Sequence, residues 1–382
     1  MTTAQQCELP GHRVRRPLRV AYLNAWYKAG LSDGGFAHVN QFIRNATALG
    51  HQVWTAAANE HPQRHPMPTA RLALGRVMRS MDVVYVRLEW SMPRAARLAS
   101  GIYRHLLGSR PMVWEFNTVP EYGRLLGHSR EEVDAAVRAY RRHAQDCDLA
   151  VCVSSALATY VTKQLGIRRA LVVPNGSDPE LFRPDLVPSR RAQRRPHGLN
   201  VLWMGSAHLA WNDFEMLRGA AEALWEKHRD DRVCFHVLGG GFEGTVARMP
   251  PNVHYHGRES YEALPQWLAG MDVGLCLYRS GPADYGSPLK LFDYMSSGLT
   301  VVATAHPQVR EVFHELGQPD LMLEQGDARG LARVLEDLAT RRDRLRHQGA
   351  AGRELVVRKY NWRRAVEDTF DAIEDLLQAR ER

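Results

Sequence analysis

Cysteine is scarce in this chain of 382 residues, which contains five cysteines in no tight pairing pattern. An odd, scattered set excludes a disulfide framework and favours a reducing compartment. No run approaches the roughly 18 apolar residues that a membrane-spanning helix needs. The segment before Arg19 also lacks the apolar core of a signal peptide. We therefore expect a cytoplasmic protein.

Two catalytic patterns are absent as well. The serine pairs at 154–155 and 296–297 lack the Gly-x-Ser-x-Gly context of a serine hydrolase. His254 and His256 would share one face of a strand, but no nearby residue completes a set of three metal ligands. The sequence therefore predicts neither serine hydrolysis nor a metal site.

Charge of one sign is not concentrated anywhere, although the formal net charge is +8. Much of the excess comes from scattered arginine pairs at 141–142, 190–191 and 194–195. They are not interleaved with aromatic residues as in a nucleic-acid groove, so we expect no nucleic-acid partner. The pattern is typical of a solvated surface. The alternative is attraction for an anionic nucleotide, or peripheral contact with phospholipid at the inner face of a membrane.

What the chain does contain is a regular alternation of short apolar strands and helices. The first series has strands near 18–23, 50–57, 82–86, 111–116, 149–154 and 170–174, with helices up to 49 and at 93–107, 131–144 and 155–165. The second has strands near 200–205, 232–238, 253–256 and 273–278, with helices at 213–228, 261–270, 331–338, 341–359 and 362–378. This order predicts an α/β protein with two doubly wound, Rossmann-like parallel sheets. We expect domains at 17–184 and 199–360, a linker at 185–198, and a last helix in 361–382.

The most informative segment is Gly286-Ser-Pro-Leu-Lys-Leu-Phe-Asp293, which directly follows an apolar strand. Ser287 is placed to cap a helix, and Pro288 suits a first helical turn. The free N–H groups of Gly286, Ser287 and Leu289 would then face a ligand at a positive helix end that suits phosphate oxygens. Lys290 adds a positive charge, and Asp293 could accept hydrogen bonds from sugar hydroxyls. A capped helix start without a ligand is the simpler alternative.

Two glycine-rich segments could also approach a ligand. Gly34 and Gly35 precede a helix that we expect to start near His38, so they indicate either a ligand loop or a plain flexible loop. The run 239–244 matches Gly-x-Gly-x-x-Gly after a strand. Only 245–249 could be helical before Pro250, which is too short for a dinucleotide pyrophosphate site. A nicotinamide cofactor is therefore not expected.

Several blocks, taken in order, resemble one family: the glycosyltransferases of group 1, a large retaining group similar to family 4, with the GT-B fold. The resemblance extends from about residue 19 to 377. Its blocks are Ser32-Asp-Gly-Gly-Phe, Asp148-Leu-Ala-Val-Cys-Val-Ser-Ser, Val173-Pro-Asn-Gly-Ser-Asp178, Val201-Leu-Trp-Met-Gly205, Val237-Leu-Gly-Gly-Gly, His256-Gly-Arg, Met271-Asp-Val-Gly-Leu-Cys-Leu-Tyr278, the segment at 286–293 and Tyr360-Asn-Trp362.

The resemblance implies two domains facing a cleft, with the last helix crossing back to the N-terminal domain. It implies a nucleotide diphosphate-sugar donor, an acceptor hydroxyl on a sugar, a lipid-linked group or a small molecule, and no metal or other cofactor. It places Gly34, Gly35 and His38 at the diphosphate and acceptor. The donor-binding residues that it implies are Gly205, Ser206, Arg258, Tyr278, Gly286, Ser287, Pro288, Leu289, Lys290 and Asp293. As catalytic residues it implies Lys290, Asp293, Asn117 and Glu115.

Three positions depart from the family pattern. Tyr285 stands where the first of two paired acids is expected, with Asp284 one position out of register. Asn117 replaces a histidine, and an arginine and a lysine that usually follow the glycine at 205 are missing. These departures leave two alternatives open. One is a sugar-nucleotide epimerase using Glu115, Glu121 and His38, and the other is a catalytically silent subunit.

Overall fold

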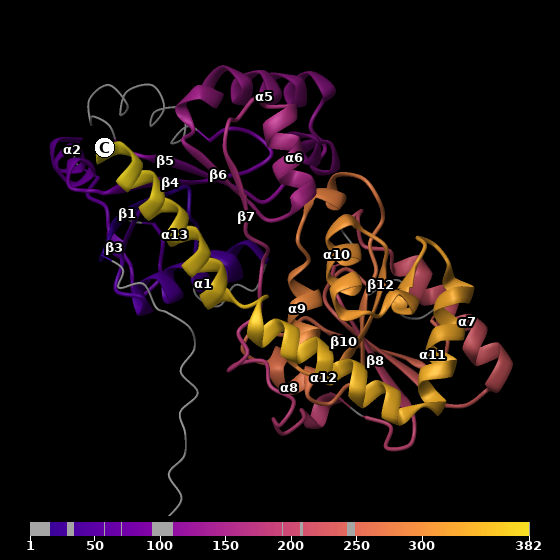
Figure 1. Cartoon of the computed structure of the whole chain (residues 1–382). Helices are drawn as coiled ribbons and strands as arrows, with labels where there is room; N and C mark the ends of the chain where they lie inside the picture. The colour runs from indigo at the N-terminus through magenta and orange to yellow at the C-terminus, as the bar shows by residue number, and fades with distance from the viewer. Residues whose placement is uncertain are drawn as a thin grey trace, which may run out of the picture.

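The chain forms two parallel α/β sheets in a computed structural model that describes residues 16–28, 34–56, 58–69, 71–93, 110–192, 194–206, 209–242 and 249–381 (Figure 1). The expected helices at 93–107 and 245–249 lie largely outside these ranges. Every strand pairing between named strands is parallel. The prediction of two doubly wound sheets is therefore confirmed.

The N-terminal sheet has the strand order β3-β2-β1-β4-β5-β6-β7. Its strands are β1 (Arg19–Leu23), β2 (Gln52–Thr55), β3 (His65–Pro66), β4 (Val83–Leu88), β5 (Met112–Phe116), β6 (Leu149–Cys152) and β7 (Ala170–Val172). The helical segments beside it are α1 (Gly34–Ala48), α2 (Arg71–Arg79), η2 (Pro120–Leu126), α5 (Arg130–His143), η3 (Ala144–Asp146) and α6 (Ser155–Lys163).

The C-terminal sheet has the order β10-β9-β8-β11-β12-β13. Its strands are β8 (Leu199–Met204), β9 (Val233–Leu238), β10 (Val253–Gly257), β11 (Val273–Cys276), β12 (Thr300–Thr304) and β13 (Met322–Leu323). The helical segments beside it are η4 (Arg190–Ala192), α7 (Phe214–His228), α8 (Leu264–Leu268), η6 (Pro282–Tyr285), α9 (Leu289–Ser296), α10 (Pro307–Leu316), η7 (Pro319–Leu321), α11 (Ala328–Thr340) and α12 (Arg342–Arg358). The last helix of the chain is α13 (Trp362–Glu381).

Burial on both faces explains the apolar strands. All residues of β8 and β9 are buried, as expected for parallel strands covered by helices on each side. One continuous core fills the C-terminal domain, and two cores lie on opposite faces of the N-terminal sheet. In open parallel sheets of this kind, ligands bind at the carboxyl ends of the central strands. We therefore expect a site in the loops that follow those ends.

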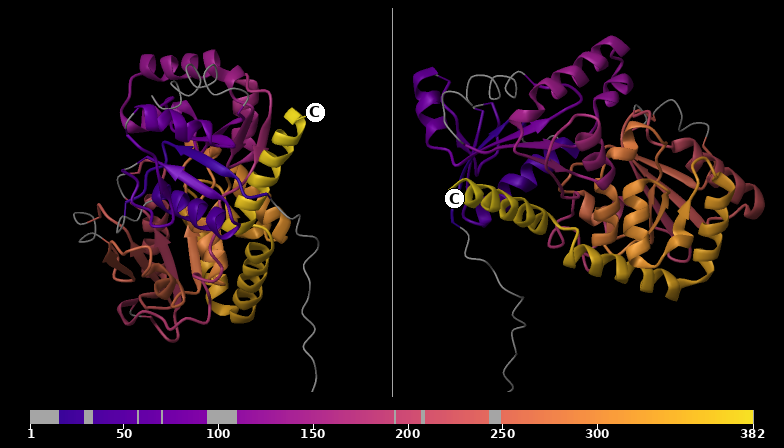
Figure 2. Two further views of the ribbon diagram at one scale, coloured as in Figure 1. Left: turned by 90° about the vertical axis from the view of Figure 1, so that its left-hand side faces the viewer. Right: turned by 45° about the horizontal axis from the view of Figure 1, so that its top comes forward.

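The last helix packs on the N-terminal domain. Helix α12 lies on the C-terminal domain, and α13 continues beyond it to end beside the N-terminal sheet (Figures 1 and 2). Val366, Phe370 and Ile373 of α13 share a core with Val39 and Phe42 of α1. Among the described residues, no helix is long and apolar enough to cross a bilayer.

Candidate active site

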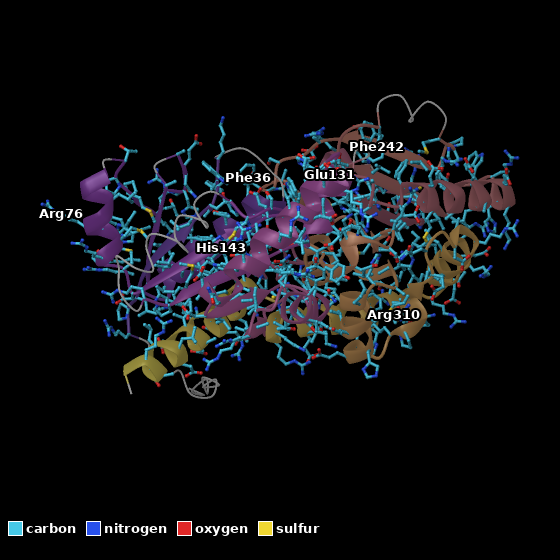
Figure 3. All side chains as sticks on the ribbon, turned by 90° about the horizontal axis from the view of Figure 1, so that it is seen from above. Phe36, Arg76, Glu131, His143, Phe242 and Arg310 are labelled. Atoms are coloured by element: carbon cyan, nitrogen blue, oxygen red, sulfur yellow. The ribbon has the colours of Figure 1, made fainter. Side chains whose placement is uncertain are left out.

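A cleft of about 880 Å³ lies between the two domains and is lined from both sides. Its N-terminal wall comes from the segments that follow β1, β4 and β5 and from the start of α1. Its C-terminal wall comes from the segments that follow β8, β9, β11 and β12. Figure 3 labels Phe36, which lines the cleft from α1. The volume is at the upper end of the range of small-molecule sites.

The N-termini of two helices meet across this cleft. Helix α1 begins at Gly34 and α9 at Leu289, and a Cβ added to Gly34 would lie 3.0 Å from Leu289 Cδ1. The prediction that Gly34 and Gly35 form a loop before a helix near His38 is therefore wrong, because both glycines already belong to the first turn of α1. The first-turn N–H groups of a helix lack acceptors within the helix. Two positive helix ends thus face the same space.

The segment before α9 is held differently from the prediction. Pro288 is the N-cap residue, and no side-chain hydrogen bond caps the helix. Ser287 instead bonds to the other domain, since its Oγ accepts from the Asn175 N–H at 3.1 Å and its carbonyl accepts from Asn175 Nδ2 at 2.7 Å. The Gly286 N–H donates to the Ala283 carbonyl at 3.0 Å. Expectations of a Ser287 cap, a first-turn Pro288 and a free Gly286 N–H are therefore wrong.

Lys290 lies between two aromatic rings at the end of the central strands. Its Nζ is 4.9 Å from the ring centroid of Trp203 and 4.7 Å from that of Tyr278. It also donates to Asn212 Oδ1 at 3.3 Å. Burial lowers the pKa of Lys290 to about 8. Within the described ranges no carboxylate pairs with this ammonium, so cation–π attraction and one amide stabilise it.

Asp293 lies one turn beyond Lys290 and is 5% exposed in the cleft wall. Its Oδ1 accepts a hydrogen bond from the Ser177 hydroxyl at 2.6 Å. Burial raises the pKa of Asp293 to about 7, and that hydrogen bond only partly opposes the shift. The site thus holds a buried acid and a half-buried base whose pKa values lie close together.

Glu115 does not reach the cleft but lies behind it, 1% exposed. Tyr22 Oη donates to its Oε2 at 2.8 Å, and Asn117 Nδ2 donates to Oε1 at 2.7 Å. His38 Nε2 is 3.2 Å from Oε1, and Arg87 also donates to this oxygen. Burial alone would raise the pKa of Glu115, but His38 and Arg87 outweigh it and hold the pKa well below its usual range. Glu115 is therefore a fixed anion that positions its neighbours.

His38 connects this anion to the α9 segment. Its Nδ1 lies 3.0 Å from Asn175 Oδ1, and the same amide donates to the Ser287 carbonyl. A hydrogen-bonded chain thus runs from Glu115 through His38 and Asn175 to the loop before α9. Asn175 was not predicted as a site residue. Its place in the Pro-Asn-Gly turn directly after β7 is the signal that could have indicated it.

Tyr285 points away from the cleft. Its ring packs against Tyr160 at 5.4 Å, its carbonyl accepts from Ser154 Oγ at 2.7 Å, and its side chain joins an N-terminal core. The preceding Asp284 instead lies 2.6 Å from Nδ1 of His306, a buried residue in the cleft wall. Nothing in the sequence indicated His306, because it belongs to the loop after β12 and only the fold brings it to Asp284.

The loop after β8 approaches the loop after β9 through glycines. A Cβ at Gly239, where φ is +144°, would lie 1.5 Å from the Gly205 carbonyl oxygen. At Gly240 it would lie 2.2 Å from Arg258 Nε, so the Arg258 guanidinium packs directly on that backbone. Ser206 Oγ donates to the Gly240 carbonyl at 3.4 Å. Gly239 and Gly240 therefore allow close packing of the strand ends; residues 243 and 244 of the run lie outside the described ranges.

The structure brings most of the predicted site residues together. Those that line the cleft are Gly34, Gly35, His38, Asn117, Gly205, Ser206, Arg258, Tyr278, Gly286, Ser287, Pro288, Leu289, Lys290 and Asp293. Cleft-lining residues that sequence reasoning missed include Trp26, Tyr122, Leu126, Asn175, Trp211 and His306. Among the described residues, no group of three histidine, cysteine or acidic side chains is arranged to hold a metal ion.

Comparison with known families identifies the class of protein. Residues 198–341 match the family model described as glycosyl transferases group 1, and residues 32–181 match glycosyltransferase family 4. The two models cover most of both domains, and the facing parallel sheets are those of the GT-B fold. The chain belongs to the group 1 glycosyltransferases with this fold.

Individual relatives agree with that class. The chain is 27% identical over 179 residues to a putative teichuronic acid biosynthesis glycosyltransferase, TuaH, from Bacillus subtilis (strain 168); the match covers 45% of this chain and 44% of TuaH. It thus spans less than half of that relative. A sucrose-phosphate synthase from Thermosynechococcus elongatus superimposes with a TM-score of 0.65 at 14% identity, covering 95% of this chain and 100% of the other. Anabaena HepE in complex with UDP-glucose superimposes with a TM-score of 0.67 at 15% identity, covering 95% of this chain and 100% of the other.

Proposed function

We propose that this glycosyltransferase moves a sugar from a nucleotide diphosphate-sugar to an acceptor hydroxyl, with retention of configuration at the anomeric carbon. The arrangement that carries the proposal is the meeting of two helix N-termini beside Lys290, an ammonium group with no carboxylate partner in the described part of the chain. Such a place favours the charge of a diphosphate. HepE, one of the similar structures, was solved with UDP-glucose.

The cleft residues suit distinct parts of such a donor. The first turns of α1 and α9, with Lys290, would bind the diphosphate and stabilise its growing charge as the sugar leaves. Asp293 would accept hydrogen bonds from the ribose hydroxyls, and the backbone beside Arg258 would read the base. With two helix ends and basic side chains opposing the charge, we propose that no metal is required. Activity in EDTA equal to that in added Mg²⁺ is the expected result.

Retention would follow from attack on the same face as the departing group. The acceptor oxygen bonds to the anomeric carbon, the bond from that carbon to the phosphate oxygen breaks, and the acceptor proton passes to the leaving diphosphate. This sequence needs no enzyme nucleophile. The protein contributes position and electrostatic stabilisation. Proton NMR of the product should show the same anomeric configuration as the donor.

A Lys290→Ala variant tests the diphosphate assignment. We expect kcat to fall about 100-fold, the scale for one group that stabilises transition-state charge. Lys227→Ala is the matched control, because Lys227 pairs with Glu336 on the surface of the C-terminal domain. Unchanged turnover when Lys290 and Asp293 are both replaced by alanine would show that the donor lies elsewhere.

An epimerase would need free acid and base side chains in the cleft, and the contacts of Glu115, Glu121 and His38 do not favour this alternative. Glu115 is enclosed by four partners, and Glu121 accepts a hydrogen bond from the Tyr160 hydroxyl at 2.8 Å. His38 is bonded on both ring nitrogens. Incubation of the enzyme with a nucleotide-sugar and no acceptor should therefore leave the sugar configuration unchanged.

A further inference from the structure

Two exposed apolar side chains line the N-terminal wall of the cleft. Among the large apolar side chains that are exposed in the described part of the chain are Trp26, 50% exposed, and Leu126, 51% exposed. Both line the cleft. Leu125, 37% exposed, directly precedes Leu126 in the sequence. Single exposed apolar residues need no explanation, but several beside a ligand cleft indicate a binding surface.

The exposure of Trp26 is maintained by a tethered loop. Asn24 has the left-handed backbone conformation, with φ of 57°, and its Oδ1 accepts from the indole N–H of Trp26 at 3.1 Å. Asn24 Nδ2 donates to the Arg87 carbonyl at 3.0 Å, and the Ala25 carbonyl accepts from buried Asn59 at 2.8 Å. On the other side of the ring, the Tyr27 carbonyl accepts from the Glu60 N–H at 3.0 Å, so the loop is held both before and after Trp26. A fixed ring loses little conformational freedom when it binds a ligand.

Leu126 is fixed as well, at the end of η2. A Cβ at Gly123 would lie 2.6 Å from the Trp90 ring, so η2 packs directly on Trp90. His128 stacks on the same ring at 3.9 Å. From the middle of η2, Tyr122 reaches across the cleft to Trp211, with ring centroids 5.1 Å apart. The apolar surface therefore belongs to a braced part of the cleft and lies in continuity with the C-terminal wall.

Several polar side chains on the same wall already have partners within the protein. Arg87 and Asn117 both donate to Glu115, and His38 contacts Glu115 and Asn175. The Asn24 amide bonds on both its oxygen and its nitrogen. A sugar that displaced water beside these four side chains would gain few new hydrogen bonds for its hydroxyl groups, which is costly. An apolar group of a ligand has no hydrogen bonds with water to lose when it binds to the same surface.

We infer that the acceptor carries an apolar group next to its accepting hydroxyl, and that Trp26 and Leu126 bind this group. The inference rests on the proposed function, because it assigns to the acceptor the wall opposite Lys290 and Asp293. The apolar group is an alkyl chain or an aromatic ring. Both offer the same chemistry to an indole and a leucine side chain.

Calorimetric binding of three probes in the presence of UDP tests this inference. The probes are methyl, hexyl and phenyl β-D-glucoside, which share one polar part and differ in the apolar group. Hexyl or phenyl glucoside should bind at least about tenfold more tightly than methyl glucoside, since a hexyl group adds five methylenes to bury. A stronger effect of hexyl indicates an alkyl acceptor, and a stronger effect of phenyl an aromatic one.

Variants separate the proposed surface from general hydrophobic binding. Trp26→Ala should remove most of the advantage of the hexyl and phenyl probes. Val187→Ala, at an 83% exposed position outside the cleft lining, should keep it. Equal or undetectable binding of all three probes, or an advantage that survives Trp26→Ala, would overturn the inference. Failure of every nucleoside diphosphate to bind would instead indicate that the proposed function itself is wrong.

Discussion

At the scale of single residues, the site depends on two side chains with oppositely shifted pKa values. Burial raises the pKa of Asp293 to about 7 and lowers that of Lys290 to about 8. At pH 7 these values leave Asp293 about half ionised and Lys290 still mostly protonated in the free protein. A diphosphate would favour the charged form of Lys290, and hydroxyl donors would favour the charged form of Asp293.

We therefore expect kcat/KM for the donor to have a bell-shaped pH profile with its maximum between about pH 7 and 8. Activity should rise with pH as Asp293 ionises, and fall at higher pH as Lys290 loses its proton. Initial rates from pH 5.5 to 9.5 measure the profile. Asp293→Asn should remove the acidic limb and Lys290→Arg the alkaline limb. If the acidic limb persisted in Asp293→Asn and the alkaline limb in Lys290→Arg, groups other than these two would be responsible for the pH dependence.

Gly239 makes a second prediction at this scale. Gly239→Ala would place a methyl group against the Gly205 carbonyl at a φ of +144°, and should lower the free energy of unfolding by about 3 kcal/mol or more. Gly75→Ala is the control, because Gly75 lies in α2 with nothing near its Cβ position. That variant should gain about 0.5–1 kcal/mol. Urea unfolding distinguishes them, and equal stabilities would contradict the proposed close approach.

Individual residues also show what the sequence could not reveal. Lys290 and Asp293 could be selected because their spacing after a strand has a local meaning. The sequence-based cap at Ser287 was wrong, because Asn175, 112 positions earlier in the chain, bonds to its hydroxyl. Local capping rules describe an isolated helix end, whereas here a contact from the other domain replaces the cap.

At the scale of elements, β9 and β10 bring three histidines together. His236 Nδ1 lies 3.1 Å from His256 Nε2, and the His236 and His254 rings are 5.6 Å apart. Burial, followed by its histidine and arginine neighbours, lowers the pKa of His236 to about 3. Burial also lowers the pKa of His256 to about 4. The folded state therefore keeps these rings neutral where an unfolded chain would protonate them.

This cluster should make the C-terminal domain sensitive to acid. A depressed histidine pKa leaves stability intact above about pH 6.5 and reduces it as the pH falls, because the unfolded state then binds more protons. His236→Phe should reduce the stability lost between pH 7 and 4.5 by about 2–3 kcal/mol. Exposed His347→Gln is the control. Denaturant unfolding at pH 7 and at pH 4.5 measures the free energy of unfolding. If wild type and His236→Phe lost the same amount between these pH values, the histidine cluster would not be the cause of the acid sensitivity.

Most elements could be predicted because buried parallel strands are apolar throughout and the helices between them are regular. The sequence did not indicate the strands β3 and β13, because two residues carry no periodicity. The helices α2 and α10 were not predicted either. Segment η2 also escaped, because Pro120 and Gly123 resemble a loop. Its position depends on the packing of Gly123 against Trp90 and of Tyr122 against Trp211. Such contacts between distant segments leave no local pattern.

At the scale of the whole molecule, α13 joins the end of the chain to the N-terminal domain. Phe370 is fully buried and lies 6.0 Å from Phe42 and 3.8 Å from His51 between ring centroids. Phe370→Ala should lower the free energy of unfolding by about 3–5 kcal/mol. Gln378→Ala, at an exposed position of the same helix, should change it little. A small loss for Phe370→Ala would show that α13 contributes little to the N-terminal core.

The two domains also meet through the site itself. Ser177 bonds to Asp293, Asn175 to Ser287 and Ser154 to the Tyr285 carbonyl. Residues of the N-terminal domain thus hold the loop before α9, and α9 itself, in place. The sequence predicted two facing domains. Which side chains would join them depended on the fold, because every one of these pairs is more than 100 positions apart.

Calorimetric titration with UDP, GDP and ADP tests the central claim most directly, because it requires no acceptor. We expect at least one of the three to bind wild type and the Lys227→Ala control equally well. Binding to Lys290→Ala should be about tenfold weaker or more, because a charge-assisted contact to phosphate contributes roughly 1.5–3 kcal/mol. No binding of any nucleoside diphosphate, or equal binding to Lys290→Ala, would contradict the assignment of this cleft as a nucleotide-sugar site.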